Sequence, residues 1–159
     1  MLPQKPVLDS DKELWNDYAE LCGNRLISEL RPFLKENFGY SDRHINRHLN
    51  LGLTATINAY TLKYDIYLRL FPAPEAGWPR ETLIIARIGF HRPRKGYGRK
   101  LLSLICEQSA ELGYQHIAIE SPNENSTAFG QRFGLKVMEN GRNLLGSVED
   151  VKRALGQAA

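Results

Sequence analysis

Residues 83–102, LIIARIGFHRPRKGYGRKLL, contain the three features that decide the fold of this chain. The apolar run 83–88 predicts a buried strand. The loop after it is rich in glycine and basic, with five Lys or Arg side chains among residues 92–100. From Leu101 and Leu102 onward, apolar residues recur with the spacing of one helix face. A strand, a basic glycine loop and a helix start, in this order, predict a phosphate site.

The physical basis of this prediction is the start of the helix. Gly96 and Gly98 let the backbone approach an anion closely. The first N–H groups of a helix have no partner within the helix, and the helix dipole is positive at this end. The loop lacks the Gly-Lys-Ser/Thr ending of a P-loop, and Leu101 stands where a dinucleotide fingerprint needs its third glycine. We therefore expect a polyanionic ligand held by another type of loop.

The loop resembles the acyl-CoA-binding loop of the GNAT N-acetyltransferase superfamily, which is usually written Gln/Arg-x-x-Gly-x-Gly/Ala. Gly96 and Gly98 match its two glycines, and Arg94 and Lys95 fill its two variable places. Pro93 occupies the Gln/Arg place. Because proline has no N–H, it cannot donate a hydrogen bond to phosphate there.

A second segment carries the resemblance further along the chain. Asn123, Ser126 and residues 133–135 fit the register of the family's Asn-x-x-Ala and Gly-Phe pair. The family's Tyr, which often acts as general acid toward the departing CoA thiolate, falls on Gly130. A register that begins at Asn125 supplies no Tyr either.

The resemblance implies the fold class, α/β (α+β). A GNAT-like chain has a mixed twisted sheet of about six strands, helices on both faces and a central, splayed pair of parallel strands. Residues 83–90 and 115–120 would form that pair. The resemblance is strongest over residues 80–145, and we expect residues 1–159 to form a single GNAT-like acyltransferase domain.

Hydrophobic periodicity and turn signals predict the remaining elements. A capping box at Ser10-x-x-Glu13 predicts a helix that runs to about Arg31. Two courses are open beyond it: Pro32 ends the helix, or Pro32 only kinks it and Phe33 and Leu34 continue the apolar face until Gly39 stops the region. A second, short helix is expected from Ser41 or Asp42 to about Leu49. The other expected elements are strands at 54–60 and 64–71, a short helix near 125–132, a hairpin over 136–145 with a type I′ turn at Asn140-Gly141, and a last helix to about Leu155. The family's first strand is not evident, and Pro3 and Pro6 argue against placing it at residues 2–8.

The resemblance implies acetyl-CoA as co-substrate, with no metal. The backbone near residues 89–91 would pair with the pantetheine amides like an added strand. His44 and His48 would lie one helical turn apart, but no third metal ligand is evident. The residues expected to bind the cofactor are Ile88, Gly89, Phe90, His91, Arg94, Lys95, Gly96, Tyr97, Gly98, Arg99, Lys100, Asn123 and Ser126.

The implied reaction is transfer of an acetyl group to a primary amine by direct attack in a ternary complex. The amine must be neutral to attack, so a base or a water chain removes its proton. Glu120, beside the splay, is the first choice for this base, and Glu81, at the start of the central strand, is the second. Glu120 is also compatible with a solvated strand end or a cap for the next helix, and a one-residue slip in the strand would turn Glu81 to the opposite face. The acceptor stays open among small molecules, proteins and aminoacyl-tRNA.

Composition agrees with one soluble domain. The chain has 159 residues, 42% hydrophobic content and a net charge of +3, and none of its apolar runs is long enough to span a bilayer. The first residues lack a secretory signal, so we expect a cytoplasmic protein. Cys22 and Cys106 lie on apolar helix faces, which predicts reduced thiols in the core. A homodimer is compatible with the sequence.

Two other functions are left open by the sequence. The first is an acyl-CoA-binding protein of the same fold that has lost catalysis, because Pro93 and Gly130 depart from the family pattern. The second is a nucleic-acid-binding α/β domain that uses the basic residues 92–100.

Overall fold

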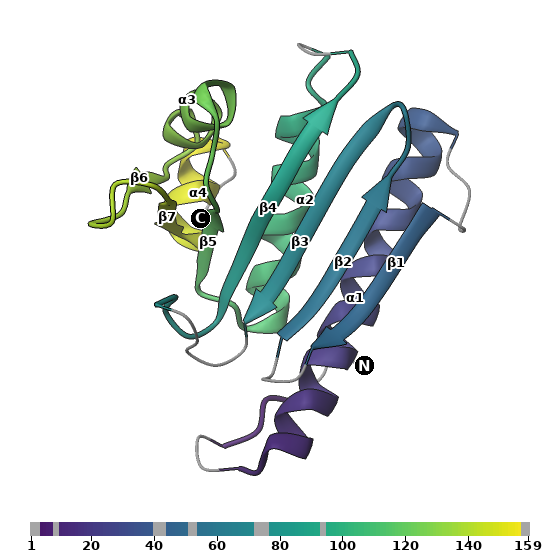
Figure 1. Ribbon diagram of the computed structural model, residues 1–159, viewed down its shortest axis with the longest axis vertical. Helices are drawn as coiled ribbons and strands as arrows, with labels where there is room; N and C mark the ends of the chain where they lie inside the picture. The colour runs from purple at the N-terminus through teal and green to yellow at the C-terminus, as the bar shows by residue number, and fades with distance from the viewer. Residues whose placement is uncertain are drawn as a thin grey trace.

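The computed structural model describes residues 4–7, 10–39, 44–50, 54–71, 77–92 and 95–156. Figure 1 shows a twisted sheet with α1 and α2 side by side behind it. The elements in chain order are α1 (Lys12–Phe38), β1 (Ile45–Asn50), β2 (Thr54–Tyr60), β3 (Tyr64–Phe71), β4 (Thr82–Phe90), α2 (Tyr97–Leu112), β5 (His116–Ile119), α3 (Glu124–Arg132), β6 (Lys136–Val137), β7 (Leu144–Ser147) and α4 (Val148–Ala154).

The sheet is mixed, and its strand order is β1-β2-β3-β4-β5-β7-β6. The first four strands form an antiparallel meander, whereas β4 and β5 are parallel neighbours. Strands β5, β7 and β6 are again antiparallel. The predicted fold class is therefore confirmed, including the central parallel pair, although the sheet has seven strands instead of about six.

Helix α1 follows the longer of the two courses that the sequence left open. Its N-cap is Asp11, whose side chain accepts a hydrogen bond from the Leu14 N–H, so the predicted capping box at Ser10 was wrong. The helix continues through Pro32 to Phe38 and Gly39 is its C-cap, so Pro32 does not end it. Phe33 and Leu34 are buried immediately after the proline. Burial of this continued apolar face offsets the backbone hydrogen bond that Pro32 cannot make.

Residues 45–50 form strand β1, and the predicted helix that ends near Leu49 was wrong. Every residue of β1 has a partner in β2, from Ile45 opposite Ala59 to Asn50 opposite Thr54. Pairing with a neighbouring strand outweighs a weak local helix preference. The first strand of the sheet therefore follows α1, and residues 4–7 contain no regular element.

The hairpin near residue 140 also differs from its predicted turn. Gly141 has a φ of 72°, but Asn140 is not among the described residues with positive φ, so the turn is not type I′. Instead the Gly141 N–H donates to the Met138 carbonyl, and the Asn140 side chain accepts from the N–H groups of Arg142 and Asn143. The loop is thus longer than a two-residue turn.

The two faces of the sheet are covered differently. The main core gathers buried side chains from α1, α2 and α4 against alternate residues of the strands, such as Leu83 and Ile85. The smaller cluster on the opposite face consists of Trp78, Ile84 and Ala118 with Met138 and Leu145, none of which is helical. Among the described residues, this second face is covered by the segment at Trp78 and by the β6–β7 hairpin.

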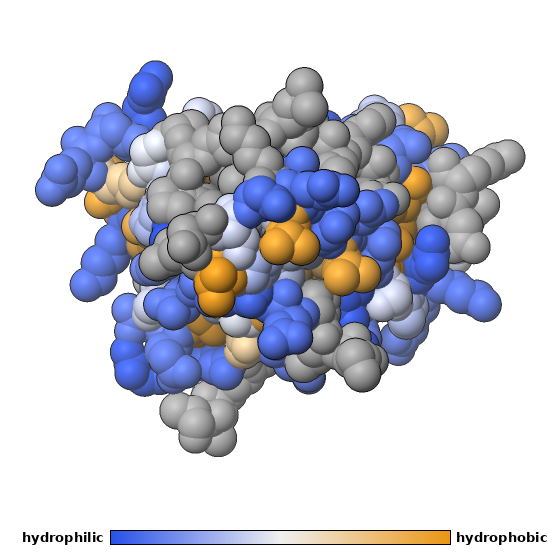
Figure 2. All heavy atoms as spheres, turned by 90° about the horizontal axis from the view of Figure 1, so that it is seen from below, coloured by the Kyte–Doolittle hydropathy of each residue, from blue (hydrophilic) through white to orange (hydrophobic). Residues whose placement is uncertain are grey.

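The lower end of the molecule is mainly polar. Seen from below, apolar residues form separate patches among polar ones (Figure 2). The described residues in this view therefore show no broad apolar surface of the kind that marks a partner interface. In the described ranges, no helix has both the length and the apolar composition of a membrane span.

Candidate active site

Strand β4 loses its partner on one side halfway along its length. Its parallel pairing with β5 ends at Ile85 opposite Ile119, and the Glu120 N–H makes a last hydrogen bond to the Ile85 carbonyl. Residues 86–90 continue to pair with β3 only. In Figure 1 the chain after β5 turns away from β4 toward α3. One edge of β4 is therefore open in the described part of the chain.

A β-bulge in β4 lies where the two strands part. Tyr67 and Leu68 of β3 are consecutive, but they oppose Arg87 and Ile85, so Ala86 is an extra residue. The bulge shifts the alternation of side chains by one position. As a result, Ile88 and Phe90 pack against the same core as Ile85, and Arg87 turns to the other face, where it binds Asp65.

The register of β4 determines which backbone groups reach the open edge. The His91 N–H donates to the Lys63 carbonyl on the β3 side. Because hydrogen-bonding direction alternates along an antiparallel strand, the N–H and C=O of Gly89 also face β3. Those of Ile88 and Phe90 face the open edge. Of the predicted residues 88–91, Ile88 and Phe90 are thus the two that present unpaired backbone groups to a ligand.

Helix α2 begins immediately after this edge and lacks a side-chain cap. Gly96 is its N-cap, with a φ of 78°. The other three helices are capped by the side chains of Asp11, Asn123 and Ser147. The first-turn N–H groups of α2 have no such acceptor, so they are available to an anion. The exposed side chains of Lys95 and Lys100 flank them.

Gly98 lies in the first turn of α2 and faces α3. A Cβ atom at this position would lie 3.1 Å from the ring of Phe129. The glycine therefore permits close approach of α2 and α3, in addition to leaving the helix start open. The adjacent Tyr97 packs against Phe38, with ring centroids 4.7 Å apart.

Several of the other predicted cofactor residues have partners within the protein. The Arg99 guanidinium donates to the Leu155 carbonyl at 2.8 Å. Asn123 and Ser126 bond to each other's backbone in a capping box at the start of α3. Arg94 lies outside the described residues.

Glu120 lies at the apex of the splay. Both of its carboxylate oxygens accept hydrogen bonds from the Arg69 guanidinium, at 2.7 and 2.8 Å. Arg69 alternates with the buried Leu68 and Leu70, which places it on the face opposite the main core. The pair therefore crosses β4 above Ile84, and each oxygen of Glu120 accepts one hydrogen bond from Arg69.

Glu81 lies at the closed end of the β4–β5 pair. Its carboxylate forms an ion pair with Lys5, and its carbonyl accepts from the N–H groups of Gln115 and His116. At about 3.3 Å per residue, four residues separate it from Ile85 by about 13 Å. The structure therefore brings Glu120, and not Glu81, to the place where the strands part.

Gly130 does not occupy a position that could present a Tyr to a ligand. A Cβ atom there would lie 2.5 Å from Leu144 and 3.0 Å from Ile119, so this face of α3 points into the core. The aromatic residue of α3 that faces the start of α2 is Phe129, which has no proton to donate. The sequence register that placed the family's Tyr on Gly130 thus gives no general acid in space.

The described residues contain no group of three or more His, Cys, Asp or Glu side chains that could hold a metal ion. His44 and His48 do not share a helix, because residues 45–50 form a strand. Cys22 and Cys106 are free and buried, which confirms the predicted core thiols.

Sequence reasoning missed three residues of this region, Arg69, Lys63 and Phe129. The alternation in β3 predicts that Arg69 leaves the core face, but its contact with Glu120 depends on the strand order. The carbonyl of Lys63, in the β2–β3 turn, accepts the His91 N–H and so fixes the register of β4 next to its open edge. Phe129 meets Gly98 only because α3 packs beside α2.

Searches of protein-family models and of curated proteins find no match. Among solved structures, the chain is similar to an acetyltransferase of the GNAT family from Staphylococcus aureus, with 12% identity, 89% of this chain and 97% of that chain covered, and a TM-score of 0.47. It is also similar to GCN5 from Tetrahymena, with 12% identity, coverages of 89% and 92%, and a TM-score of 0.45.

A third similar structure is a mutant of the toxin AtaT, bound to the C-terminus of the antitoxin AtaR and to acetyl-CoA. The identity is 16%, 82% of this chain and 86% of that chain are covered, and the TM-score is 0.45. The fold itself is established by the strand order and register described above.

Proposed function

We propose that this protein is an acetyl-CoA-dependent N-acetyltransferase. The observation that carries the proposal is the open edge of β4, which leads directly into the uncapped start of α2. The N–H and C=O groups of Ile88 and Phe90 suit the pantetheine amides, which would add to β4 like a further strand. The N–H groups at the start of α2 suit the diphosphate. These two features fit the two chemically distinct parts of one ligand.

The thioester would lie near the β-bulge, beside Glu120. A primary amine that attacks it must lose a proton, and Glu120 is the carboxylate at the apex of the splay. The amine would give that proton to a lone pair of Glu120 that Arg69 does not occupy, and Arg69 would hold the carboxylate in place. With no Tyr on α3 to protonate the thiolate, water would supply that proton. Positioning alone can lower the barrier by about 7–11 kcal/mol, so the proposal does not require a dedicated acid.

Calorimetric titration with acetyl-CoA, with RNA as the competing ligand, tests the proposal. We expect saturable binding of acetyl-CoA, followed by release of free thiol when a panel of primary amines is added. A folded protein that binds RNA but not acetyl-CoA would overturn the proposal. Binding without thiol release for any amine would favour the non-catalytic acyl-CoA-binding protein, which Gly130 and the paired state of Glu120 also support.

The role of Glu120 has its own test. Glu120→Gln should lower kcat by about a hundredfold and leave the affinity for acetyl-CoA within about twofold. Asp65→Asn is the matched control, because Asp65 is a carboxylate on the same face whose partner is Arg87. We expect this control to keep its turnover within about twofold. Unchanged turnover of the Glu120 variant at every pH would remove Glu120 as the base.

A further inference from the structure

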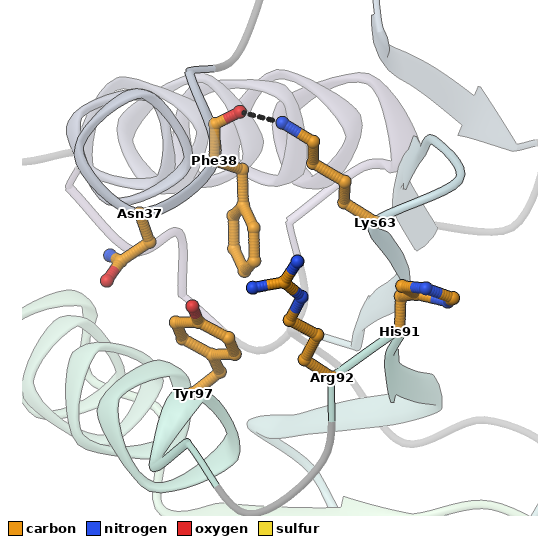
Figure 3. Close-up of a pocket in the computed structure, with 6 residues that line it drawn as sticks. All are labelled: Asn37, Phe38, Lys63, His91, Arg92 and Tyr97. Atoms are coloured by element: carbon orange, nitrogen blue, oxygen red, sulfur yellow. Dashed lines mark hydrogen bonds between the residues drawn. The ribbon is translucent and has the colours of Figure 1, made fainter.

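The structure has a pocket at each end of β4. One of about 270 Å³ lies between the end of α1 and the start of α2 (Figure 3) and, because it borders the loop that joins β4 to α2, belongs to the candidate active site. The other, the lower pocket, has about 410 Å³ and lies where β4 and β5 begin. The nine residues of β4 separate the two by roughly 30 Å. The residues that line the lower pocket are Lys5, Pro6, Arg80, Glu81, Gln115 and His116.

Three segments form the walls of the lower pocket, and Glu81 joins them. Its carbonyl accepts hydrogen bonds from the N–H groups of Gln115 and His116, at 2.9 and 3.1 Å, which links the start of β4 to the start of β5. Its carboxylate forms an ion pair with Lys5, which attaches the segment of residues 4–7. The Glu81 φ of 60° is uncommon for a residue with a side chain. These bonds hold the walls in place before a ligand arrives.

Among the described residues, Arg80 lines the lower pocket without an anionic partner. Its guanidinium lies over the Trp15 ring, 5.3 Å from the centroid, and this contact fixes its position. Its Nε is buried and makes no hydrogen bond to the described part of the chain. The adjacent carboxylate, that of Glu81, is paired with Lys5 instead. A cation that has lost part of its hydration without gaining an acceptor is stabilised by an anionic ligand.

The charges of the lining residues suit a ligand with one negative charge. Arg80 and Lys5 contribute two positive charges and Glu81 one negative charge, which leaves one positive charge when His116 is neutral. The planar guanidinium matches the geometry of a carboxylate, which accepts two parallel hydrogen bonds from it. The volume of the lower pocket lies within the range of about 300–1,000 Å³ that is usual for small-molecule sites.

We propose that the lower pocket binds a small monocarboxylate, whose carboxylate pairs with the Arg80 guanidinium. Glu81 keeps Lys5 occupied, so Arg80 rather than Lys5 receives the ligand. The apolar part of the ligand contacts Pro6, which lines the same pocket. The site is independent of the proposed function, because its lining includes no residue of the open β4 edge or of the start of α2.

Nuclear magnetic resonance of the full chain tests the proposal, with propionate as the probe and its neutral counterpart propionamide as the ligand control. The indole N–H signal of Trp15 reports binding, because Arg80 lies over this ring. The chain has two Trp residues, so Trp78→Phe identifies the Trp15 signal. We expect this signal to shift saturably with propionate, and not with propionamide or with sodium chloride at the same ionic strength.

Two substitutions should change the affinity for propionate in opposite directions. Arg80→Gln should lower it at least tenfold, because the charge-assisted hydrogen bonds are lost. Glu81→Gln should raise it about threefold or more, because this change removes a negative charge beside the ligand and frees Lys5. Arg153→Gln, which changes an exposed arginine of α4, is the matched control and should leave the affinity unchanged. A purely structural role of Arg80 and Glu81 does not predict opposite changes.

Unchanged affinity in a folded Arg80→Gln protein, or equal binding of propionate and propionamide, would overturn the proposal. If Arg80→Gln does not fold, Glu81→Gln decides, and an affinity that it fails to raise would overturn the proposal too. Tighter binding of inorganic phosphate than of propionate would overturn the assignment to a carboxylate. Displacement of propionate by acetyl-CoA would place the probe in the cofactor site and so contradict the lower pocket. Arg80-dependent binding of propionate to a protein that does not bind acetyl-CoA would support the lower pocket while the proposed function fails.

Discussion

At Gly130, the missing side chain determines how closely α3 can approach the sheet. The position is buried, and a Cβ atom would overlap Leu144 and Ile119 from two neighbouring strands. Glycine normally weakens a helix by about 1 kcal/mol relative to alanine. Here it is required for packing, although its place in the sequence suggested a lost catalytic residue.

Gly130→Ala should therefore destabilise the protein by about 1–3 kcal/mol, because the added methyl group overpacks the core. Urea unfolding measures this change. Gly89→Ala is the matched control, because a Cβ atom at Gly89 meets no atom within 4 Å. Leu144→Val should recover part of the loss in combination with Gly130→Ala. An increase in stability for Gly130→Ala alone would contradict the packing described for α3.

The strand order of the sheet determines which side chain pairs with Glu120, namely Arg69. The two residues are 51 positions apart in the chain: Arg69 lies in β3, and Glu120 directly follows β5, which is not a neighbour of β3 in the sheet. Their pairing depends on β4 lying between them with the small Ile84–Ala118 surface beneath. The sequence also allowed Glu120 to be a solvated carboxylate at the end of a strand. In the structure it is instead paired with Arg69.

The start of α2 is the part of the fold on which the proposed function depends. It combines a glycine N-cap, free first-turn N–H groups and a close neighbour, Phe129 of α3. A helix start of this kind is stabilised by any negative charge, whether from a ligand or from an added side chain.

Gly98→Glu separates these two effects. The new carboxylate should stabilise the helix dipole and so nearly offset the small shift required of the Phe129 ring. It should weaken acetyl-CoA binding by about tenfold or more, because it repels the diphosphate and fills the space beside it. Calorimetry and thermal unfolding together measure the two effects.

Ala110→Glu adds the same charge to an exposed position near the other end of α2. This control should bind acetyl-CoA as the wild type does. A folded Gly98→Glu protein with unchanged affinity would show that the diphosphate does not lie at the start of α2.

Strand β1 is a strand because it pairs with β2, and not because of its own sequence pattern. The residues 45–50 have no strong strand pattern of their own, and their polar side chains suit an exposed helix face equally well. The edge of β2 offers six backbone partners, and the segment becomes a strand. This is why the prediction from local pattern was wrong there and right for the apolar strands β2, β3 and β4.

For the molecule as a whole, two thiols in the core link stability to pH. Burial raises the pKa of Cys22 and that of Cys106 from 9.0 to about 11. Burial also raises the pKa of Tyr18 and Tyr114. In the unfolded chain these groups would ionise at lower pH than in the folded protein.

The free energy of unfolding should therefore fall as pH rises from about 9 to about 11. In this window the unfolded thiols have lost their protons while the buried thiols retain them, and each contributes a loss of about 2–3 kcal/mol. Urea unfolding at several pH values measures the slope. The double variant Cys22→Ala, Cys106→Ala should show a shallower slope, with the tyrosines accounting for what remains above pH 10. Equal slopes for the two proteins would contradict this assignment.

The sequence by itself determined the segments whose pattern is local. The apolar run of β4, the glycine loop and the amphipathic face of α2 lie within 30 consecutive positions, and their periodicity and turn residues suffice to predict strand, phosphate loop and helix. Both buried cysteines follow from the same helical spacing. These features need no knowledge of what lies beside them.

Tertiary structure alone decided everything that depends on which segments become neighbours. The strand order brings Arg69 to Glu120, the packing of α3 on β5 and β7 requires Gly130, and the extension of α1 past Pro32 brings Phe38 to Tyr97. The physical reason is that burial and backbone pairing are satisfied by the chain as a whole. The local preference of a residue for helix or strand is a fraction of a kcal/mol. Burial and backbone pairing therefore outweigh this preference wherever they favour a different structure.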